Sequence, residues 1–319
     1  RQRQMCIRDR ANTSGSNNVA VGTEALFTAS NLGNTTAVGY RALYTNGNTG
    51  YNNTAVGYLS LANNSSGSQN NAFGRECLEN NTTGDNNCGF GYLTLTTNTT
   101  GSSNTAFGHN ALFGNTTAND NTAVGFDAME DNTTGAANTA VGKDALTNNT
   151  TGSENVAIGY NALFSATTAS ENVAIGLDAL ESVTTGGGNT AIGEKAGYQL
   201  TTGSTNVYVG IQAGRNHNTG SNSVFIGNDP IPTTGDMDDQ IILGNSSTGA
   251  IRCQVQTISS LSDERDKTEI IDSVYGLDVI NSLKARQFKW NIRVDPEAMY
   301  PVSRNNGKVE LGFVAQEIN

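Results

Sequence analysis

Residues Asn138–Glu154 read NTAVGKDALTNNTTGSE, and residues Asn155–Glu171, which follow directly, read NVAIGYNALFSATTASE. Both stretches fill one 17-residue template: an apolar triplet, a glycine, a second apolar position and a polar tract. We call the glycine after the triplet the rung glycine, and count template positions from it, so that position −1 precedes it. Thirteen intervals separate the rung glycines; twelve are 17 residues long and one is 18. The set is Gly22, Gly39, Gly57, Gly74, Gly91, Gly108, Gly125, Gly142, Gly159, Gly176, Gly193, Gly210, Gly227 and Gly244. So strict a period predicts a repeat protein in which one short unit stacks on the next.

The template predicts the shape of one rung. Position −1 is always Val, Ile, Leu or Phe, position −3 is mostly Thr or Val, and Ala usually stands between them. This alternation is typical of a strand with one face buried, so we expect positions −3 and −1 to point inward and Ala outward. Position +4 is Leu or Met in ten units, and the Asn-, Thr- and Gly-rich tracts favour turns. Each rung is therefore expected to hold a strand, a bend, a second apolar segment and a polar turn.

Stacking is what would give this chain a core, because one 17-residue unit cannot bury its own apolar face. We predict an all-β fold, a parallel β-solenoid over residues 11–250. With rungs about 4.8 Å apart, the rod would be roughly 60 Å long. Eleven units carry Asn at position −4, from Asn18 and Asn53 to Asn206. These side chains are predicted to form a ladder of stacked amides.

The outward alanine stripe suggests a contact between chains, because small side chains let another backbone approach closely. The stripe widens to Tyr208, Phe225 and Ile242 in the last three units, and we expect it to pack around a three-fold axis. The alternative is an ordinary solvent face. The repeats resemble the β-roll heads of trimeric autotransporter adhesins, which carry an N-[ST]-x-A-[IV]-G signature, usually in shorter units. That resemblance implies a left-handed, trimeric β-roll.

Composition restricts the partners. Residues 11–250 hold 5 Lys and Arg against 18 Asp and Glu, a net charge of −13, which disfavours nucleic acid and anionic membranes. No stretch approaches the roughly 18 apolar residues of a membrane span, no secretory signal is visible, and no cofactor or metal is expected. Residues 1–10, RQRQMCIRDR, match nothing in the repeat and resemble translated adaptor or vector sequence, so they are set aside as a non-native tail.

Other reactive side chains carry little signal. Cys77 and Cys88 take template positions of Ala and Thr, which favours small buried thiols over a disulfide and fits assembly in a reducing cytoplasm. His109 and His217 both fall in repeat turns, 108 residues apart in sequence, and indicate neither a Ser-His-Asp triad nor a zinc cluster. The acidic group Asp229, Asp236, Asp238 and Asp239 is compatible with a calcium site but is more typical of solvated loop acids.

The template ends after residue 250, and a different domain follows. Residues 251–261 are predicted to form a linker strand, and residues 262–319, which include the one Trp of the chain, a small α+β domain. Within it we expect a helix over Tyr275–Ala285, a strand over Gln287–Trp290 and a loop over Pro296–Gly307.

Three motifs in this domain occur in order: SDERDKTEI from Ser262, GLDVINSLKARQFKW from Gly276 and ELGFVAQEI from Glu310. Together they resemble the C-terminal intramolecular chaperone domain of phage tail fibres and endosialidase tail spikes, which is also a self-cleaving serine peptidase. The family domain usually continues beyond the GFVAQEIN at which this sequence ends, so the domain is expected to be truncated.

The resemblance implies that three such domains hold three chains in register and then cut themselves off. Carried over, it makes Ser262 the nucleophile, Lys267 the general base and Ser262–Asp263 the scissile bond. A lysine can serve as the base only when neutral, and burial lowers its pKa, so packing of the trimer would switch cleavage on. The local pattern alone would make Ser262 a helix N-cap.

These observations predict a structural and receptor-binding segment of a phage tail fibre or spike. It would be a homotrimer located in the virion tail and assembled in the host cytoplasm, with a host cell-surface receptor, most often a glycan, and other tail proteins as partners. The only enzymatic activity expected is self-cleavage, with no external substrate. Alternatives are a bacterial surface adhesin, a glycan-degrading tail spike and an ice-binding solenoid; uniform repeats disfavour the second and divergent Thr-Thr turns the last.

Overall fold

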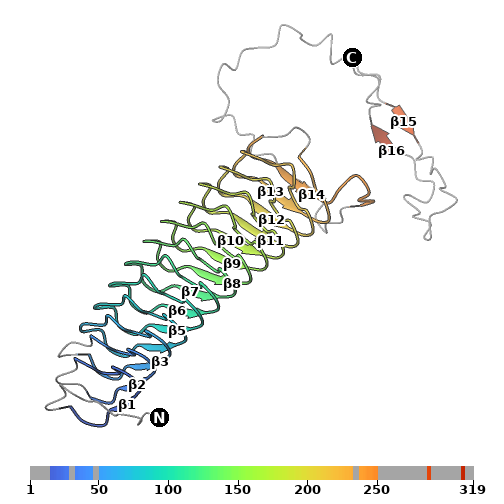
Figure 1. Ribbon diagram of the computed structural model, residues 1–319. Helices are drawn as coiled ribbons and strands as arrows, with labels where there is room; N and C mark the ends of the chain where they lie inside the picture. Colours follow the sequence, from blue (N-terminus) through green and yellow to red (C-terminus); the bar gives the residue numbers. More distant parts are fainter. Residues whose placement is uncertain are drawn as a thin grey trace, which may run out of the picture. The chain divides into compact units, whose positions relative to one another are not determined.

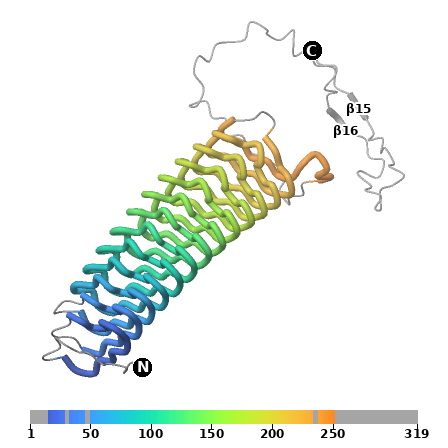
Figure 2. Tube along the Cα trace, viewed as in Figure 1, coloured from blue at the N-terminus to red at the C-terminus, as the bar shows by residue number. Residues whose placement is uncertain are grey.

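The computed structural model describes residues 15–28, 33–45, 50–232 and 237–250, and two short strands further on. The chain divides into two compact units, Arg1–Ile251 and Arg252–Asn319. The described residues of the first unit form a parallel β-solenoid without helices, in which successive coils stack along one axis (Figures 1 and 2). In the second unit, β15 (Arg286–Phe288) pairs antiparallel with β16 (Glu310–Gly312). β15 overlaps the strand predicted at Gln287–Trp290; the predicted helix, loop and linker strand lie outside the described residues.

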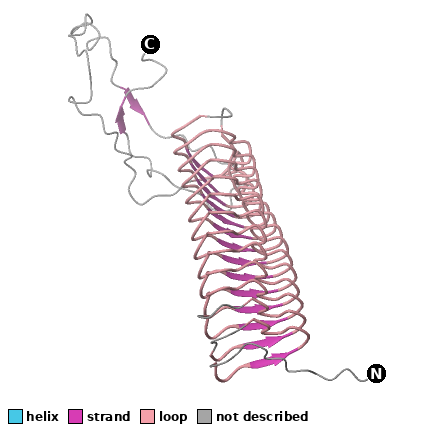
Figure 3. Ribbon diagram, turned by 60° about the vertical axis from the view of Figure 1, so that its left-hand side comes forward, coloured by secondary structure: helices cyan, strands magenta, loops and turns pink. Residues whose placement is uncertain are grey.

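Each rung contributes one three-residue strand, and the fourteen strands form a single parallel sheet in chain order. The strands make one column along the solenoid, and the rest of each coil is loop (Figure 3). Template positions face each other across neighbouring strands, as Ala140 faces Ala157. The strands are β1 (Val19–Val21), β2 (Thr36–Val38), β3 (Thr54–Val56), β4 (Asn71–Phe73), β5 (Cys88–Phe90), β6 (Thr105–Phe107), β7 (Thr122–Val124), β8 (Thr139–Val141), β9 (Val156–Ile158), β10 (Val173–Ile175), β11 (Thr190–Ile192), β12 (Val207–Val209), β13 (Val224–Ile226) and β14 (Ile241–Leu243).

The rung glycine makes the bend after each strand. In the first thirteen rungs its φ lies between +127° and +149°, a region that residues other than glycine rarely adopt. The neighbouring rung also leaves no space: a Cβ on Gly142 would lie 2.7 Å from the carbonyl carbon of Gly159. Backbone conformation and close stacking therefore both require glycine at this position.

The second apolar segment, between the bend and the polar turn, buries two adjacent residues in each rung. Ala145 and Leu146 are both buried, although adjacent residues of a regular strand point to opposite faces. Leu146 has a left-handed φ of 54°, which turns its side chain back into the interior, and its N–H donates to the carbonyl of Ala162 in the next rung. The predicted second apolar segment is thus confirmed. Its backbone is not a strand, because every second residue, such as Asp144 and Leu146, has a left-handed φ.

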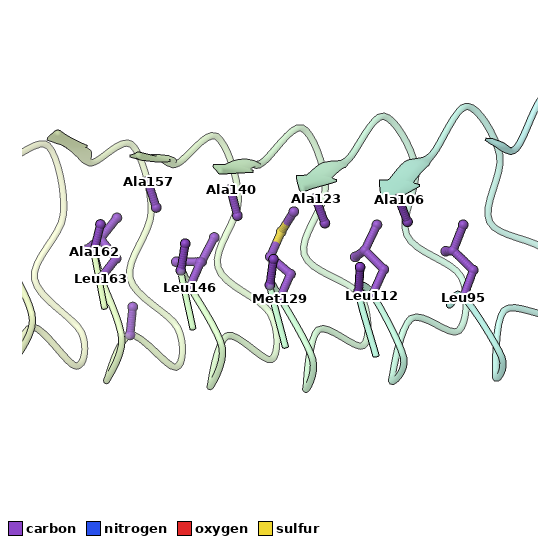
Figure 4. Close-up of a cluster of buried hydrophobic side chains, with 14 of the residues drawn as sticks. Leu95, Ala106, Leu112, Ala123, Met129, Ala140, Leu146, Ala157, Ala162 and Leu163 are labelled. Carbon is purple, nitrogen blue, oxygen red and sulfur yellow. The ribbon is translucent and has the colours of Figure 1, made fainter. Parts of the chain in front are cut away.

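The core corrects the predicted direction of the strand side chains. In ten of the fourteen strands the central residue is a buried alanine that points at the facing segment, as Ala140 and Ala123 do beside Leu146 and Met129 (Figure 4). Positions −3 and −1 point outward, so Val141 is exposed. The prediction that Ala faces outward was therefore wrong. The coil is narrow, and a small residue on the strand leaves the room that a leucine opposite it fills.

The large residues of the last rungs also lie inside rather than on an outer stripe. Tyr208 and Phe225 are fully buried, and their rings stack with centroids 5.4 Å apart. Position +4 is no longer leucine in the two rungs beside them but Gly197 and Gly214. A Cβ on Gly197 would lie 3.0 Å from the Tyr208 ring. The side-chain volume lost at Gly197 and Gly214 on one wall of the coil is thus supplied by Tyr208 and Phe225 on the opposite wall.

Two ladders of buried asparagines join the rungs. The ladder at position −4 was predicted and is confirmed: Asn138 Oδ1 accepts from the backbone N–H of Asn155, and Asn138 Nδ2 donates to the carbonyl of Gly152. The second ladder, at position +7, was missed; there Asn149 Nδ2 donates to Asn132 Oδ1 and also to Gly152. The second ladder comprises Asn64, Asn81, Asn98, Asn115, Asn132 and Asn149.

Candidate functional site

The outer face of the fourteen-stranded sheet runs along the whole described solenoid. It consists of the outward side chains at positions −3 and −1 of β1–β14, and we call it the sheet face. None of these positions holds a charged residue, although residues 11–250 contain 23 charged side chains, 18 acidic and 5 basic. Charged residues are depleted in the cores of protein interfaces in the same way.

Apolar side chains on the sheet face reach solvent along its whole length. Phe107, Ile158 and Ile226 expose 40%, 38% and 43% of their surface. Fourteen strands at about 4.8 Å and three residues at about 3.3 Å give a flat area on the order of 600 Å². The largest apolar patch of a typical soluble monomer covers roughly 300–600 Å², and larger patches mark interaction sites. Seven of the 28 side chains on the sheet face are Thr or Asn, so its apolar part is smaller than the whole face and falls within that range.

Beyond the bend, position +1 carries a row of stacked aromatic and basic side chains. The Tyr40 and Tyr58 rings stack at 5.3 Å, and the Arg75 guanidinium lies 5.5 Å and 5.4 Å from the Tyr58 and Tyr92 rings. The row continues through His109, Phe126 and Lys143 to Tyr160. The ring faces are occupied by neighbours in the row, so the row offers ring edges to the surroundings. The row runs beside the sheet face from the second rung to the ninth.

The acidic residues near the end of the solenoid do not converge. Asp238 Oδ1 accepts from the backbone N–H of Ser221, Asp239 Oδ1 accepts from Asn222, and Asp229 pairs with Arg215 at 2.9 Å. Asp236 lies outside the described residues. The described part of the chain contains no group of three His, Cys, Asp or Glu side chains placed to hold a metal ion.

The remaining reactive side chains of the solenoid serve packing. His217 is buried, with Nδ1 2.7 Å from the Tyr208 hydroxyl and Nε2 3.2 Å from the carbonyl of Met237. Because a carbonyl only accepts, Nε2 carries the proton and Nδ1 accepts from the tyrosine. Cys77 is a buried free thiol whose pKa burial raises to about 12, and Cys88 is a half-buried free thiol with a raised pKa.

Ser262, Asp263 and Lys267, the residues that the resemblance selects for self-cleavage, lie outside the described residues. Their roles therefore stay predictions, as do the predicted domain boundaries. Among the described residues no helix is long and apolar enough to cross a membrane.

Comparison with known proteins adds one finding for the C-terminal region. Residues 262–319 match a family described as chaperone of endosialidase. No curated protein matches the chain. A parallel β-solenoid followed by this domain fits a tail-fibre-type protein that carries an endosialidase-type intramolecular chaperone.

Proposed function

We propose that the chain is a structural and receptor-binding segment of a phage tail fibre or spike, assembled as a homotrimer by its C-terminal chaperone domain. The observation that carries this proposal is an uncharged, largely apolar sheet face on a solenoid that precedes a match to the endosialidase chaperone family. Trimers of that kind need an assembly domain and a surface along which the chains meet.

The sheet face suits this contact better than any other described surface. Each solenoid carries a net charge of −13, so contact along an arbitrary side would bring carboxylates together. The sheet face carries no charge, and its area on the order of 600 Å² approaches the roughly 800 Å² that each partner contributes to a standard interface. Contact there would also cover Ile158 and its equivalents and leave the acidic turns free for a host receptor or other tail proteins.

Charge placed on this face tests the assembly. In the full chain, the double variant Ile158→Lys with Ile192→Lys adds two positive charges to the sheet face. The control is the double variant Thr134→Lys with Thr151→Lys, which adds the same charge on exposed turns. Sedimentation velocity is expected to give a trimer for wild type and the turn variant, and a smaller species for the sheet-face variant. Far-ultraviolet circular dichroism should show unchanged β-structure in all three. A monomeric wild-type chain, or a sheet-face variant that remains trimeric, would contradict the proposal.

Self-cleavage is the second part of the proposal. Neutral Lys267 takes the proton of the Ser262 hydroxyl as that oxygen adds to the carbonyl carbon of the Ser262–Asp263 bond. Lys267 then gives the proton to the departing amino group of Asp263, and water hydrolyses the resulting ester, which leaves a carboxyl end and a free hydroxyl at Ser262. Denaturing gels of freshly expressed chain should show loss of residues 263–319. Ser262→Ala and Lys267→Gln should retain them, whereas Ser260→Ala should behave as wild type. Cleavage that persists in Ser262→Ala would remove the nucleophile assignment without affecting the proposed assembly.

A further inference from the structure

One hollow on the solenoid collects basic and amide side chains on an otherwise acidic surface. It lies on the turns after β11 and β12, has a volume of about 230 Å³, and is lined by Lys195, Tyr198, Gln199, Gln212, Arg215 and Asn216. These residues occupy template positions +2, +5 and +6 of two successive rungs, so they form one continuous stretch of surface.

Position +2 varies along the solenoid. It is acidic in five of the ten earlier rungs, as at Asp127, Asp144 and Asp178, and it is Lys195 and then Gln212 in the two rungs of the hollow. Two of the five basic residues of the solenoid therefore meet in a single hollow.

Lys195 differs from the other four basic residues. Arg41, Arg75, Lys143 and Arg215 each pair with a carboxylate at 2.6–2.9 Å, whereas among the described residues Lys195 forms no ion pair. Its ammonium lies 5.7 Å from the centroid of the Tyr198 ring. A half-buried ammonium beside an aromatic ring is prepared for an anion, since its charge is not neutralised within the described solenoid.

Side chains, not backbone, supply the donors in this hollow. The left-handed φ values of 55° at Lys195 and 54° at Gln212 resemble an anion-binding backbone nest. Both N–H groups are occupied, however, by the carbonyls of Leu177 and Glu194 in the preceding rungs, each at 2.8 Å. A phosphate cradle is therefore not formed. What remains is an ammonium, a guanidinium, amides and a tyrosine, which together suit one carboxylate surrounded by hydroxyls.

We propose that this hollow binds an acidic saccharide, with Lys195 contacting the sugar carboxylate and the amides of Gln199, Gln212 and Asn216 its hydroxyls. The proposal rests on the receptor-binding role proposed above and names the chemical class of the ligand. Arg215 pairs with Asp229 at 2.9 Å through Nε, and its Nη1 donates to Gln212 Oε1 at 3.5 Å, so it lines the hollow without being a free cation. Tyr198 provides the edge of the site and holds Lys195 in place.

The test measures binding of an α-1,4-linked galacturonate trisaccharide to the full chain by titration calorimetry and saturation-transfer NMR. Its methyl ester keeps the rings and removes the charge. Binding of the acid and not of the ester is expected, and Lys195→Gln should weaken it by about tenfold or more, as the loss of one charge-assisted contact would. Lys143→Gln, which removes a paired lysine elsewhere on the rod, should leave it unchanged.

Several results would overturn this site: no binding of the acid, equal binding of the ester, or unchanged affinity in Lys195→Gln. Inorganic phosphate that competes as well as the trisaccharide would also overturn it, because the hollow would then select charge alone. Sedimentation of the same samples separates the two proposals. If the chain is a trimer and does not bind the saccharide, only the proposed site is contradicted. If it is a monomer and binds the saccharide, only the proposed assembly is contradicted.

Discussion

Replacing Asn138 by alanine tests whether the asparagine ladder holds the rungs together. Asn138 Oδ1 accepts from the backbone N–H and from Nδ2 of Asn155, at 2.9 and 3.0 Å, and its own Nδ2 donates to Gly152 at 2.9 Å. The Gly152 carbonyl keeps its bond from Asn149, and Asn155 Nδ2 keeps its bond to Ala169. The Asn155 N–H alone is left buried without an acceptor.

The cost can be added from these groups. An unsatisfied buried N–H costs about 1–3 kcal/mol, and each of the two other lost hydrogen bonds about 0.5–1.5 kcal/mol. Asn138→Ala should therefore destabilise the solenoid by roughly 2–6 kcal/mol, which for a unit of this size lowers the melting temperature by roughly 5–20 °C. The control is Asn148→Ala, because half-buried Asn148 donates one bond, to Phe164, that water can replace. Its effect should stay below about 1 kcal/mol.

Thermal melts followed by far-ultraviolet circular dichroism at one protein concentration measure this difference, and hydrogen exchange of β9 locates it. Asn138→Asp separates the two functions of the amide, since the carboxylate keeps the acceptor and loses the donor. Burial should raise the pKa of that carboxyl, so its penalty relative to wild type should shrink as pH falls and the protonated acid donates to Gly152. Equal melting temperatures for Asn138→Ala and Asn148→Ala would refute the reasoning.

Two further predictions concern the core. Gly214→Leu restores the template residue but its side chain meets the ring of Tyr208, and Tyr208→Ala leaves that space empty. In chemical denaturation the double variant should be more stable than the sum of the two single effects by about 0.5–3 kcal/mol. Strict additivity would contradict the compensation of volume between the two walls. Because burial raises the pKa of Cys77 to about 12, its thiol should stay protonated and resist iodoacetamide at pH 8 while the more accessible Cys88 is alkylated, as read from peptide masses. The sign for stability follows: the unfolded thiol ionises near its ordinary pKa of about 8.5, so the contribution of Cys77 is complete below that pH and is lost toward pH 12. Cys77→Ala, which restores the template, should show a smaller loss of stability in alkali, and an identical alkaline profile would count against the burial of this thiol.

Most of the fold could be predicted from the repeat period of the sequence. A spacing of 17 residues predicts stacked rungs, and Leu at position +4 and Asn at position −4 then have to be buried, because each lands on its equivalent in the next coil. The second asparagine ladder was missed because tracts such as NNTTGSE are typical of turns. Asn132 and Asn149 nevertheless repeat at a fixed place in those tracts, and that regularity is the signal that would have found them.

The direction of the strand side chains could not be derived from hydrophobicity. A three-residue strand has only two choices, and the rule that larger apolar residues face the core selects Thr139 and Val141 over Ala140. Two facts override that rule. The leucine of the facing segment already fills the narrow coil, so only alanine fits opposite it. An outward apolar position is also stable when another surface covers it.

In this solenoid the width of the coil limits the size of the inward residue. Where a tyrosine does enter the inward position, as Tyr208 does, the opposite wall retreats to Gly197 and Gly214. Size at the inward position is thus controlled by the coil, whereas size at positions −3 and −1 is not. Val, Ile and Phe nevertheless persist at position −1 through all thirteen strands before Leu243. The proposed contact between copies along the sheet face would account for this persistence, and in that case lysine at Ile158 and Ile192 should be harmless to a lone solenoid and disruptive to an assembled one.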